Sequence, residues 1–475
     1  MKNLKIYLTP ILISVFFSCK YEMPEEPTPA PPSAGSVNFS KYISVGDGIT
    51  AGFMDATLYY EGQQNSFPNL LAKKINEVSS ISFNQPLLGS PTDNGFNPIH
   101  SVLPNLILGK LKMVKPECLQ SSITAKPTPG IPLTPYAGDK SKLNNFGVPF
   151  LKSIENLMPG YGQPTLNYFF GRFALDISSS SVLSDAASKE PTFFTLWLGN
   201  QDILGYATAG GTGNTDGIGQ YDMTNVALFD TSLKITVSTL LASGSDVKGA
   251  VANIPDILHW PFFYTVNNSL TSGKKIPFTL SQGMADTLNF LYVASTGMSP
   301  NFTGSNNNYF VIETATGIRQ MNPAKDFILL SAPSDSLGAG PMDPCDPAGV
   351  QRAGWGITKP IPNQFVLDET EVENVRTKIE AYNNSIVTVV SNYANVALVD
   401  MRGLMQQLNT TGVSSGIGVV KADIPFGGAI SLDGLHPTPK GGAVFANKFI
   451  ETINSYFEAN LHKLNPADYR GIGIP

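Results

Sequence analysis

The chain has 475 residues, of which 42% are hydrophobic and only 14% are charged, with a formal net charge of −6. This composition suits a globular chain with a large core, and the length fits one large domain with insertions or two domains. No dense run of lysine or arginine occurs, which argues against a nucleic-acid partner.

The first 19 residues have the pattern of an export signal. Two lysines precede Ile6–Ser18, an apolar run of signal-peptide length that is too short for a comfortable membrane span. Phe16-Phe17-Ser18-Cys19 resembles a relaxed bacterial lipobox, in which the cysteine becomes the lipidated first residue of the mature protein. The alternative is an ordinary signal peptide in which Cys19 is incidental.

The segment 20–38 is predicted to be a linker, because its Lys20–Ser36 part is Pro-rich and acidic and cannot pack. Such a tether favours a lipoprotein, held in the bacterial cell envelope at the outer membrane or cell surface through Cys19. Residues 39–475 are predicted to form the folded domain, with insertions at about 98–165 and 262–365.

Two cysteines, Cys118 and Cys345, remain in the mature chain. An exported protein can hold a disulfide, and an even count allows one, but two distant cysteines can equally be small buried hydrophobes. Neither cysteine has the spacing of a metal site. The Asn214–Gly217 fragment lacks the further oxygen ligands and the terminal Glu of a calcium loop, so no metal is expected.

The stretch Lys41–Phe53, KYISVGDGITAGF, organises the rest of the chain. Its β-prone residues end in the turn Gly46-Asp47-Gly48, and Ile49–Ala51 can then open a helix. Open α/β sheets place their ligands at such strand–turn–helix junctions, at the carboxyl ends of the strands.

Apolar patterning predicts further elements of an α/β chain. Continuous runs such as Thr192–Leu198 suit parallel strands buried on both faces, and helical spacing is clearest in Asp368–Tyr393. Residues 113–162 are predicted to be an elaborated loop, and 262–362 an inserted subdomain. The other predicted strands are 81–88, 247–254, 309–314, 327–330 and 396–400, and the other helices are 65–78, 169–175, 225–242, 281–295 and 438–457.

A candidate acid–base pair precedes the last helix, in Ser431–Pro437 (SLDGLHP). An Asp three residues before a His can accept the imidazole Nδ1–H and fix the tautomer, so that the other nitrogen faces the proton of a nucleophile. Asp433 is therefore the predicted orienting residue and His436 the predicted general base. Two other polar residues are predicted to be structural: His259 as a packed, hydrogen-bonded histidine and Asp202 as a helix cap.

These motifs, in this order, resemble the SGNH (GDSL-type) hydrolases. Block I of that family is Gly-Asp-Ser followed by an apolar residue and Thr, and Gly46–Thr50 matches it with Gly48 in place of the nucleophilic serine. Block III, Gly-x-Asn-Asp, supplies an oxyanion-hole amide; here Gln201 stands at that position, with Asn200 one step earlier. Ser431–Pro437 resembles block V.

Block II of the family contributes a glycine N–H to the oxyanion. Gly89–Pro98 occupies the corresponding place, and both Gly95 and Gly89 fit, with Gly95 preferred; a plain turn glycine is the alternative. The resemblance thus implies an oxyanion site made of Gly48, Gly95, Gln201 and Asn200. It also implies a three-layer α/β/α sandwich on a parallel, flavodoxin-like sheet, and hydrolysis of lipid or carbohydrate esters without a metal or other cofactor.

Two departures at chemical positions leave three hypotheses open. Gly48 has no hydroxyl, and the Gln201 amide sits on one more methylene than Asn would provide, about 1 Å or more from the expected point. The chain can be an ester hydrolase that activates water through His436, or a non-catalytic pseudo-hydrolase that binds a lipid or carbohydrate ester. Gly46-x-Gly48-x-x-Ala51 also matches a dinucleotide-binding loop, but that hypothesis leaves Asp433 and His436 unexplained.

Overall fold

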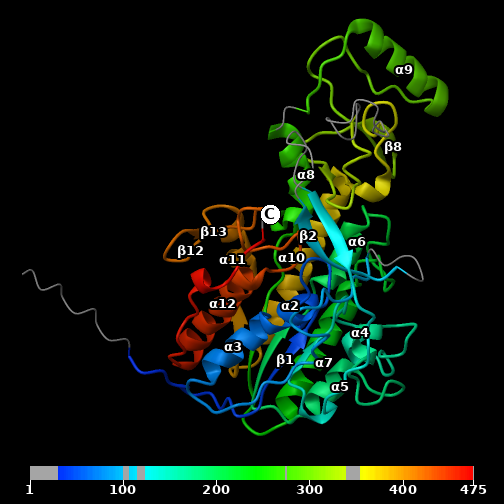
Figure 1. Ribbon diagram of the computed structural model, residues 1–475. Coiled ribbons are helices and arrows are strands. Elements are labelled where there is room, and N and C mark those ends of the chain that lie inside the picture. The colour runs from blue at the N-terminus through cyan, green and yellow to red at the C-terminus, as the bar shows by residue number, and fades with distance from the viewer. Residues whose placement is uncertain (1–29, 100–105, 115–123, 273–274, 339–353, 474–475) are drawn as a thin grey trace, which may run out of the picture. The chain divides into compact units, whose positions relative to one another are not determined.

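The computed structural model describes residues 30–99, 106–114, 124–272, 275–338 and 354–473 (Figure 1). Cys19, Cys118 and Cys345 lie outside these ranges, so lipidation and a disulfide stay predictions. The chain divides into two units, residues 1–31 and 32–475, and all elements below belong to the second. Among the described residues, we find no helix with both the length and the apolar character needed to cross a bilayer.

A five-stranded parallel sheet forms the centre of the second unit. Its strand order is β11–β6–β5–β1–β4, with β1 (Tyr42–Gly46) between β5 (Phe193–Trp197) and β4 (Asn145–Gly147). The sheet continues from β5 through β6 (Lys248–Ala252) to β11 (Val396–Val399). Because every pair is parallel, the carboxyl ends of all five strands lie at one edge. The strands predicted around 42–45, 192–198, 247–254 and 396–400 are confirmed.

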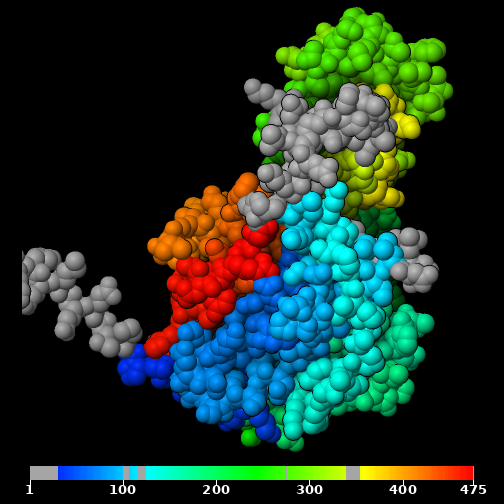
Figure 2. Space-filling view, in the orientation of Figure 1, coloured from blue at the N-terminus to red at the C-terminus, as the bar shows by residue number. Residues whose placement is uncertain are grey.

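Helices flank the sheet. The predicted α/β class with a parallel sheet is therefore confirmed, and the architecture is compatible with a flavodoxin-like sandwich. α12 (Pro439–Phe457) packs against α3 (Phe67–Ile75), and α10 (Glu369–Ser391) packs against α7 (Val226–Ala242). Figure 1 shows α3 and α12 on one side of β1 and α7 on the other. Figure 2 shows the early segment that contains α3 beside the C-terminal segment that contains α12.

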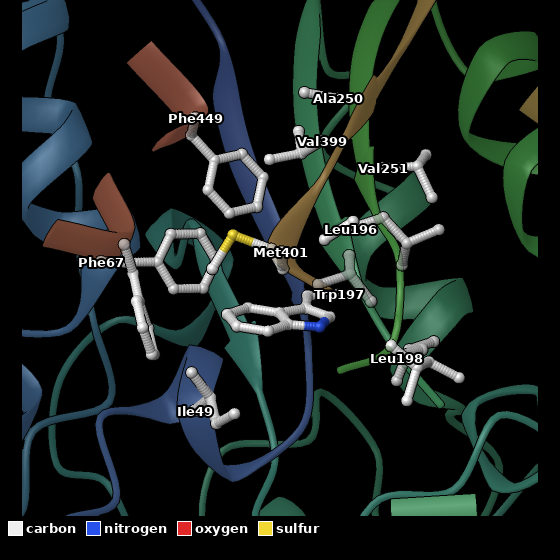
Figure 3. Close-up of a cluster of buried hydrophobic side chains, with 14 of the residues drawn as sticks. Ile49, Phe67, Leu196, Trp197, Leu198, Ala250, Val251, Val399, Met401 and Phe449 are labelled. Carbon is white, nitrogen blue, oxygen red and sulfur yellow. The ribbon is translucent and has the colours of Figure 1, made fainter. Parts of the chain in front are cut away.

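Aromatic rings fill the layer between the sheet and α12. The Phe67 ring stacks on Phe449 with centroids 4.6 Å apart and meets the Trp197 ring edge-on at 5.8 Å. Figure 3 shows these rings together with Met401 and Ile49. This packing fixes the carboxyl ends of β1 and β5, where the candidate site lies.

The strand predicted at 81–88 is wrong. The neighbour of β1 is instead β4, a three-residue strand inside the segment predicted to be a loop. Residues 81–88 have no regular structure, and Pro86 lacks the N–H that a ladder needs. Asn84 accepts the backbone N–H of Asn144 at 2.9 Å, so the segment fastens the start of β4 rather than forming a strand.

Both predicted insertions contain regular structure. In the first, β2 (Leu108–Val114) and β3 (Thr124–Pro129) pair antiparallel. The second opens with α8 (Pro261–Ser272), which the sequence pattern did not predict. The helix predicted at 281–295 is confirmed as α9 (Gln282–Thr296), with the Ser281 side chain as its N-cap.

The second insertion also has its own small apolar clusters, one of them around Phe310 and Ile312. The remaining elements of the unit are α1 (Gly48–Ala51), α2 (Tyr60–Gln64), α4 (Tyr168–Gly171), α5 (Val182–Ala187), α6 (Gln201–Thr208), α11 (Met401–Asn409), β7 (Val311–Thr314), β8 (Gly317–Gln320), β9 (Phe327–Ile328), β10 (Val366–Leu367), β12 (Val413–Ser414) and β13 (Val419–Val420).

Candidate active site

The site begins at the turn between β1 and α1. Asp47 caps α1: its Oδ1 accepts the Ile49 N–H at 3.0 Å, and its Oδ2 accepts from Asn200 Nδ2 at 2.9 Å. The bond to Asn200 ties the turn to the loop that follows β5. The Asp47 side chain is buried, and this burial raises its pKa to about 6.

Asp433 and His436 form a hydrogen-bonded pair near this turn. His436 Nδ1 lies 2.9 Å from Asp433 Oδ2, which also accepts the Ala56 N–H at 2.9 Å. Asp433 Oδ1 accepts the N–H groups of Leu435 and His436, each at 2.9 Å, and the Ser431 hydroxyl at 3.1 Å. Burial acts to raise the pKa of Asp433, but His436 and these donors outweigh it, so the pKa lies below its ordinary value. An ionised Asp433 holds the proton of His436 on Nδ1 and leaves Nε2 able to accept one.

His436 Nε2 faces Gly48. A Cβ built on Gly48 would lie 2.8 Å from Nε2 and 3.5 Å from the Cβ of Phe53. A serine at this position would therefore require the imidazole to withdraw by roughly 0.5–1 Å to reach normal hydrogen-bond geometry. The structure thus brings Gly48, Asp433 and His436 together, and the imidazole takes part of the space that a side chain at position 48 would need.

The two amides predicted for the oxyanion site point to different neighbours. Asn200 donates to Asp47 next to Gly48, and its Oδ1 is buried without a hydrogen-bond partner. Gln201 is the first residue of α6, and its Nε2 lies 3.7 Å from the place of a Cβ on Gly205, one helical turn onward. The Gln201 amide therefore lies along its own helix.

Gly95 lies beside the segment that reaches Asp433. Its φ is +72°, and a Cβ there would collide with the Leu58 carbonyl oxygen. Leu58 and Phe96 pair in an antiparallel bridge, so close backbone packing explains the glycine. Gly89, with φ +71°, packs instead against Asp93 and Ile131.

Sequence patterns did not point to the turn Met54–Thr57, which supports Asp433. Met54 and Thr57 exchange two backbone hydrogen bonds of 3.0 Å, while Asp55 and Ala56 have φ values of +54° and +60°. The left-handed region is uncommon for non-glycine residues, and Ala tolerates it less well than Asp; Asp-Ala also lacks the glycine that usually marks such a turn. The strained turn directs the Ala56 N–H at Asp433 and the Asp55 N–H at Ser431 Oγ.

The Asp55 carboxyl is a second buried acid near the site. It accepts the Tyr59 hydroxyl at 3.0 Å and the Leu432 N–H at 3.1 Å. Burial raises the pKa of Asp55 to about 6, and the negative charge of Asp433 acts in the same direction.

The second insertion is fastened to the turn that carries the pair. Phe262, the second residue of α8, donates its N–H to the Gly434 carbonyl at 3.1 Å, and Leu330 donates to the Phe262 carbonyl at 2.9 Å. A Cβ on Gly434 would lie 2.6 Å from the Phe262 nitrogen, so this approach requires glycine.

Two structural predictions need correction. Asp202 is not a cap: Asn200 holds the N-cap position of α6, and the Asp202 carboxylate accepts Ser153 N–H and Oγ–H at 2.9 and 2.7 Å. His259 is packed as expected, but its buried Nδ1 makes no hydrogen bond. Burial lowers the pKa of His259.

Two surface hollows lie away from Gly48 and His436. One, of about 800 Å³, is lined by α7, α10 and the Thr215–Asp216 segment, and the other, of about 530 Å³, by α11 and α12. In the calcium-like fragment, Asp216 instead pairs with Lys378 at 3.2 Å and accepts from Asn225 at 2.9 Å. The part of the chain that the structure describes contains no cluster of three His, Cys, Asp or Glu side chains arranged for a metal.

Comparisons with known proteins give little further guidance. No protein-family model and no curated protein matches the chain. Among solved structures, the chain is similar to an active-site mutant of a family two carbohydrate esterase from Clostridium thermocellum, described as being in complex with "celluohexase". The identity is 12%, the match covers 48% of this chain and 44% of that chain, and the TM-score is 0.18. A likeness this distant carries no argument about the site.

Proposed function

We propose that this chain carries an ester-binding site of the SGNH (GDSL-type) hydrolase kind that has lost its nucleophile. The observation that supports this most is the position of His436: its Nε2 lies 2.8 Å from the place of a Cβ on Gly48, and its Nδ1 is bonded to Asp433. A general base oriented by a carboxylate and aimed at the turn after the first strand is the arrangement that acyl transfer needs.

Without a serine, hydrolysis would have to proceed through water. His436 Nε2 would take one proton from a water molecule while the oxygen of that water bonds to the ester carbonyl carbon. The resulting oxyanion would then collapse, the ester C–O bond would break, and Nε2–H would return the proton to the departing alkoxide. Loss of the nucleophile from a triad typically lowers kcat about a millionfold. We therefore expect the site to bind an ester but to hydrolyse it very slowly.

Three observations favour this pseudo-hydrolase over an efficient esterase. The imidazole takes space that a nucleophile would need, and the Gln201 amide lies along α6. Asn200, the neighbouring amide, is engaged by Asp47. The dinucleotide hypothesis has less support, because α1 has only four residues and a helix this short offers little dipole to a pyrophosphate.

The test is restoration of the hydroxyl by Gly48→Ser. Gly48 opens α1 in a helical conformation, which serine tolerates, so the variant is expected to fold. We expect that fluorophosphonate probes do not label the wild-type protein and that it hydrolyses 4-nitrophenyl butyrate poorly. Gly48→Ser should gain both activities, and the further change His436→Ala should remove the turnover.

Gly283→Ser provides the matched control, because Gly283 lies on α9 with open space around its Cβ position and should gain nothing. Efficient turnover by the wild type would contradict the missing-nucleophile proposal. A folded but silent Gly48→Ser would show that the catalytic geometry has decayed beyond one residue.

We also propose that Cys19 is acylated and anchors the protein in the bacterial cell envelope. The lysines, apolar run and lipobox-like Phe16–Cys19 support this, and the Pro-rich segment that follows suits a tether. Mass spectrometry of the membrane fraction should find a mature protein that begins at an acylated Cys19. A soluble form without acyl chains as the main product would contradict the proposal.

A further inference from the structure

The two most exposed large apolar side chains among the described residues lie in neighbouring loops. Ile417 is 85% exposed and Phe426 is 81% exposed, and Val419, between them in the sequence, is 59% exposed. Ile417 lies at the tip of the hairpin that β12 and β13 form, and Phe426 lies in the loop that follows β13. A single exposed apolar side chain is ordinary, but a group of them at one place marks a contact surface.

Backbone hydrogen bonds hold the two loops side by side. Lys421 donates its N–H to the Gly427 carbonyl at 2.8 Å, and its own carbonyl accepts from Ala429 at 3.0 Å. Ala422 donates to the Leu408 carbonyl of α11 at 3.0 Å. The base of the hairpin is therefore fixed on the body of the unit, and both loops are presented from a rigid support.

The tip of the hairpin is a protrusion and not the wall of a pocket. A Cβ built on Gly416 or Gly418 would have no atom within 4 Å beyond its own chain neighbours. Neither surface hollow described above is lined by Ile417 or Phe426. Figure 2 shows the segment that contains them, in orange, at the surface. Sites for small molecules are concave, so this surface suits a larger partner.

Two lysines lie beside the loops. Lys421 forms a backbone bridge with Gly428, and the Lys440 side chain runs past the same glycine, with its Cδ 3.3 Å from the place of a Cβ there. Among the described residues, neither ammonium group lies within ion-pair distance of a carboxylate. The acid between the two loops is Asp423, which the Tyr264 hydroxyl approaches at 3.4 Å. Apolar tips with lysines beside them match a bilayer whose surface is negatively charged.

A bilayer also lies within reach if Cys19 carries the anchor proposed above. The segment 20–31 would then join the folded unit to the membrane, and it spans at most about 40 Å when fully extended. An anchor of this length keeps the unit at a high local concentration near the bilayer, where a weak second contact is effective.

We propose that Ile417, Val419 and Phe426 enter the interface of an anionic bilayer, with Lys421 and Lys440 at its headgroups. This contact goes beyond the proposed ester site and involves none of its residues. It determines which face of the anchored protein meets the membrane.

Vesicle binding tests this in a chain that begins at residue 20. Residues 1–31 form a unit of their own, and all the elements described above follow it, so this chain keeps the whole folded unit without the anchor. We expect it to bind phosphatidylethanolamine vesicles with about 30% phosphatidylglycerol roughly tenfold or more tightly than phosphatidylcholine vesicles in sedimentation assays. Lys421→Gln with Lys440→Gln should remove most of this difference.

A matched pair of double variants tests the apolar tips. Ile417→Ser with Phe426→Ser should weaken binding to the anionic vesicles on the order of 10- to 100-fold and leave the Tm unchanged, because both side chains are exposed. Ile218→Ser with Phe290→Ser is the control. It removes the same residue types, which are 63% and 70% exposed elsewhere on the unit, and should not change the affinity.

A gain of signal makes the test independent of these losses. Phe426→Trp should add fluorescence that brominated lipids quench, whereas the fluorescence added by Phe290→Trp should not be quenched. Absence of vesicle binding would overturn the proposal, as would equal binding to both kinds of vesicle or a loss confined to the control pair. The anchor is tested separately: vesicle binding by this chain would stand without acylation of Cys19, and an acylated Cys19 would not rescue a chain that fails to bind.

Discussion

Ala56 donates its backbone N–H to Asp433 Oδ2 at 2.9 Å, although the two residues are 377 positions apart in the sequence. The donor belongs to a turn in which two consecutive non-glycine residues have positive φ. Backbone strain in one segment thus supplies a hydrogen bond to the carboxylate that orients His436.

Ala56→Gly should raise the free energy of unfolding by about 0.5–1 kcal/mol, because glycine adopts φ +60° without a steric penalty. Urea denaturation measures the change. Ala72→Gly, within the helix α3, is the control and should lower the free energy of unfolding by about 1 kcal/mol. An equal loss in both variants would show that the turn stores no strain.

Asp433→Asn should lower the free energy of unfolding by about 2–4 kcal/mol at pH 7. The buried carboxylate accepts from three backbone N–H groups and a hydroxyl. The NH₂ group of an asparagine is itself a donor, so it would face some of these donors and leave them without an acceptor. The loss should shrink below pH 4, since a carboxylate with a lowered pKa stabilises the fold only while it is ionised. Asp286→Asn, on the exposed face of α9, is the control and should have little effect.

The effect of Asp55→Asn on the free energy of unfolding, relative to the wild type, should become more favourable as the pH rises from acid to neutral. The pKa of Asp55 is raised from 3.8 to about 6, so its stabilising effect is complete below pH 4 and is lost as the pH rises through 6. The neutral variant avoids this loss. We expect the free energy of unfolding of the variant, relative to that of the wild type, to rise by on the order of 1–3 kcal/mol from pH 4 to pH 7.5. Urea denaturation at the two pH values measures this change. A difference that does not change with pH would mean that Asp55 is not protonated in this range.

Asn200→Asp should destabilise the fold in a pH-dependent way. It would place a second carboxylate about 2.9 Å from the buried Asp47 carboxylate, and two such groups cannot both ionise readily. The Tm should therefore fall most at pH 7.5 and recover toward pH 5, where the pair can share a proton. Gln201→Glu is the matched control: its side chain lies along α6, so we expect a small change at both pH values.

Much of the sheet could be predicted from the sequence because its buried strands are continuous apolar runs. Phe193–Trp197 is such a run, and each of its residues is buried. β4 escaped prediction because Asn145–Gly147 is too short and too polar to show a pattern; its pairing with β1 places it in the sheet. The local sequence cannot reveal a strand that forms only because it pairs with another strand of the sheet.

The same distinction holds at the candidate site. The Asp433–His436 spacing falls within one turn and is visible in the sequence, whereas the turn at Asp55 and Ala56 has no glycine to mark it. The departure at Gln201 was visible too, but the direction of its amide depends on packing along α6. Long-range contacts therefore account for most of what the sequence did not indicate.

The hydrogen bond from Phe262 to Gly434 has a consequence for how the chain opens and closes. Because this bond joins the first helix of the second insertion to the turn of Asp433, we expect the two to open together. The Phe262 amide should exchange with deuterium only when its hydrogen bond to that turn opens. Excision of residues 262–365 would leave the Gly434 carbonyl without the Phe262 N–H as its donor. Any change measured in the shortened chain would then include the disturbance of this turn as well as the loss of the insertion.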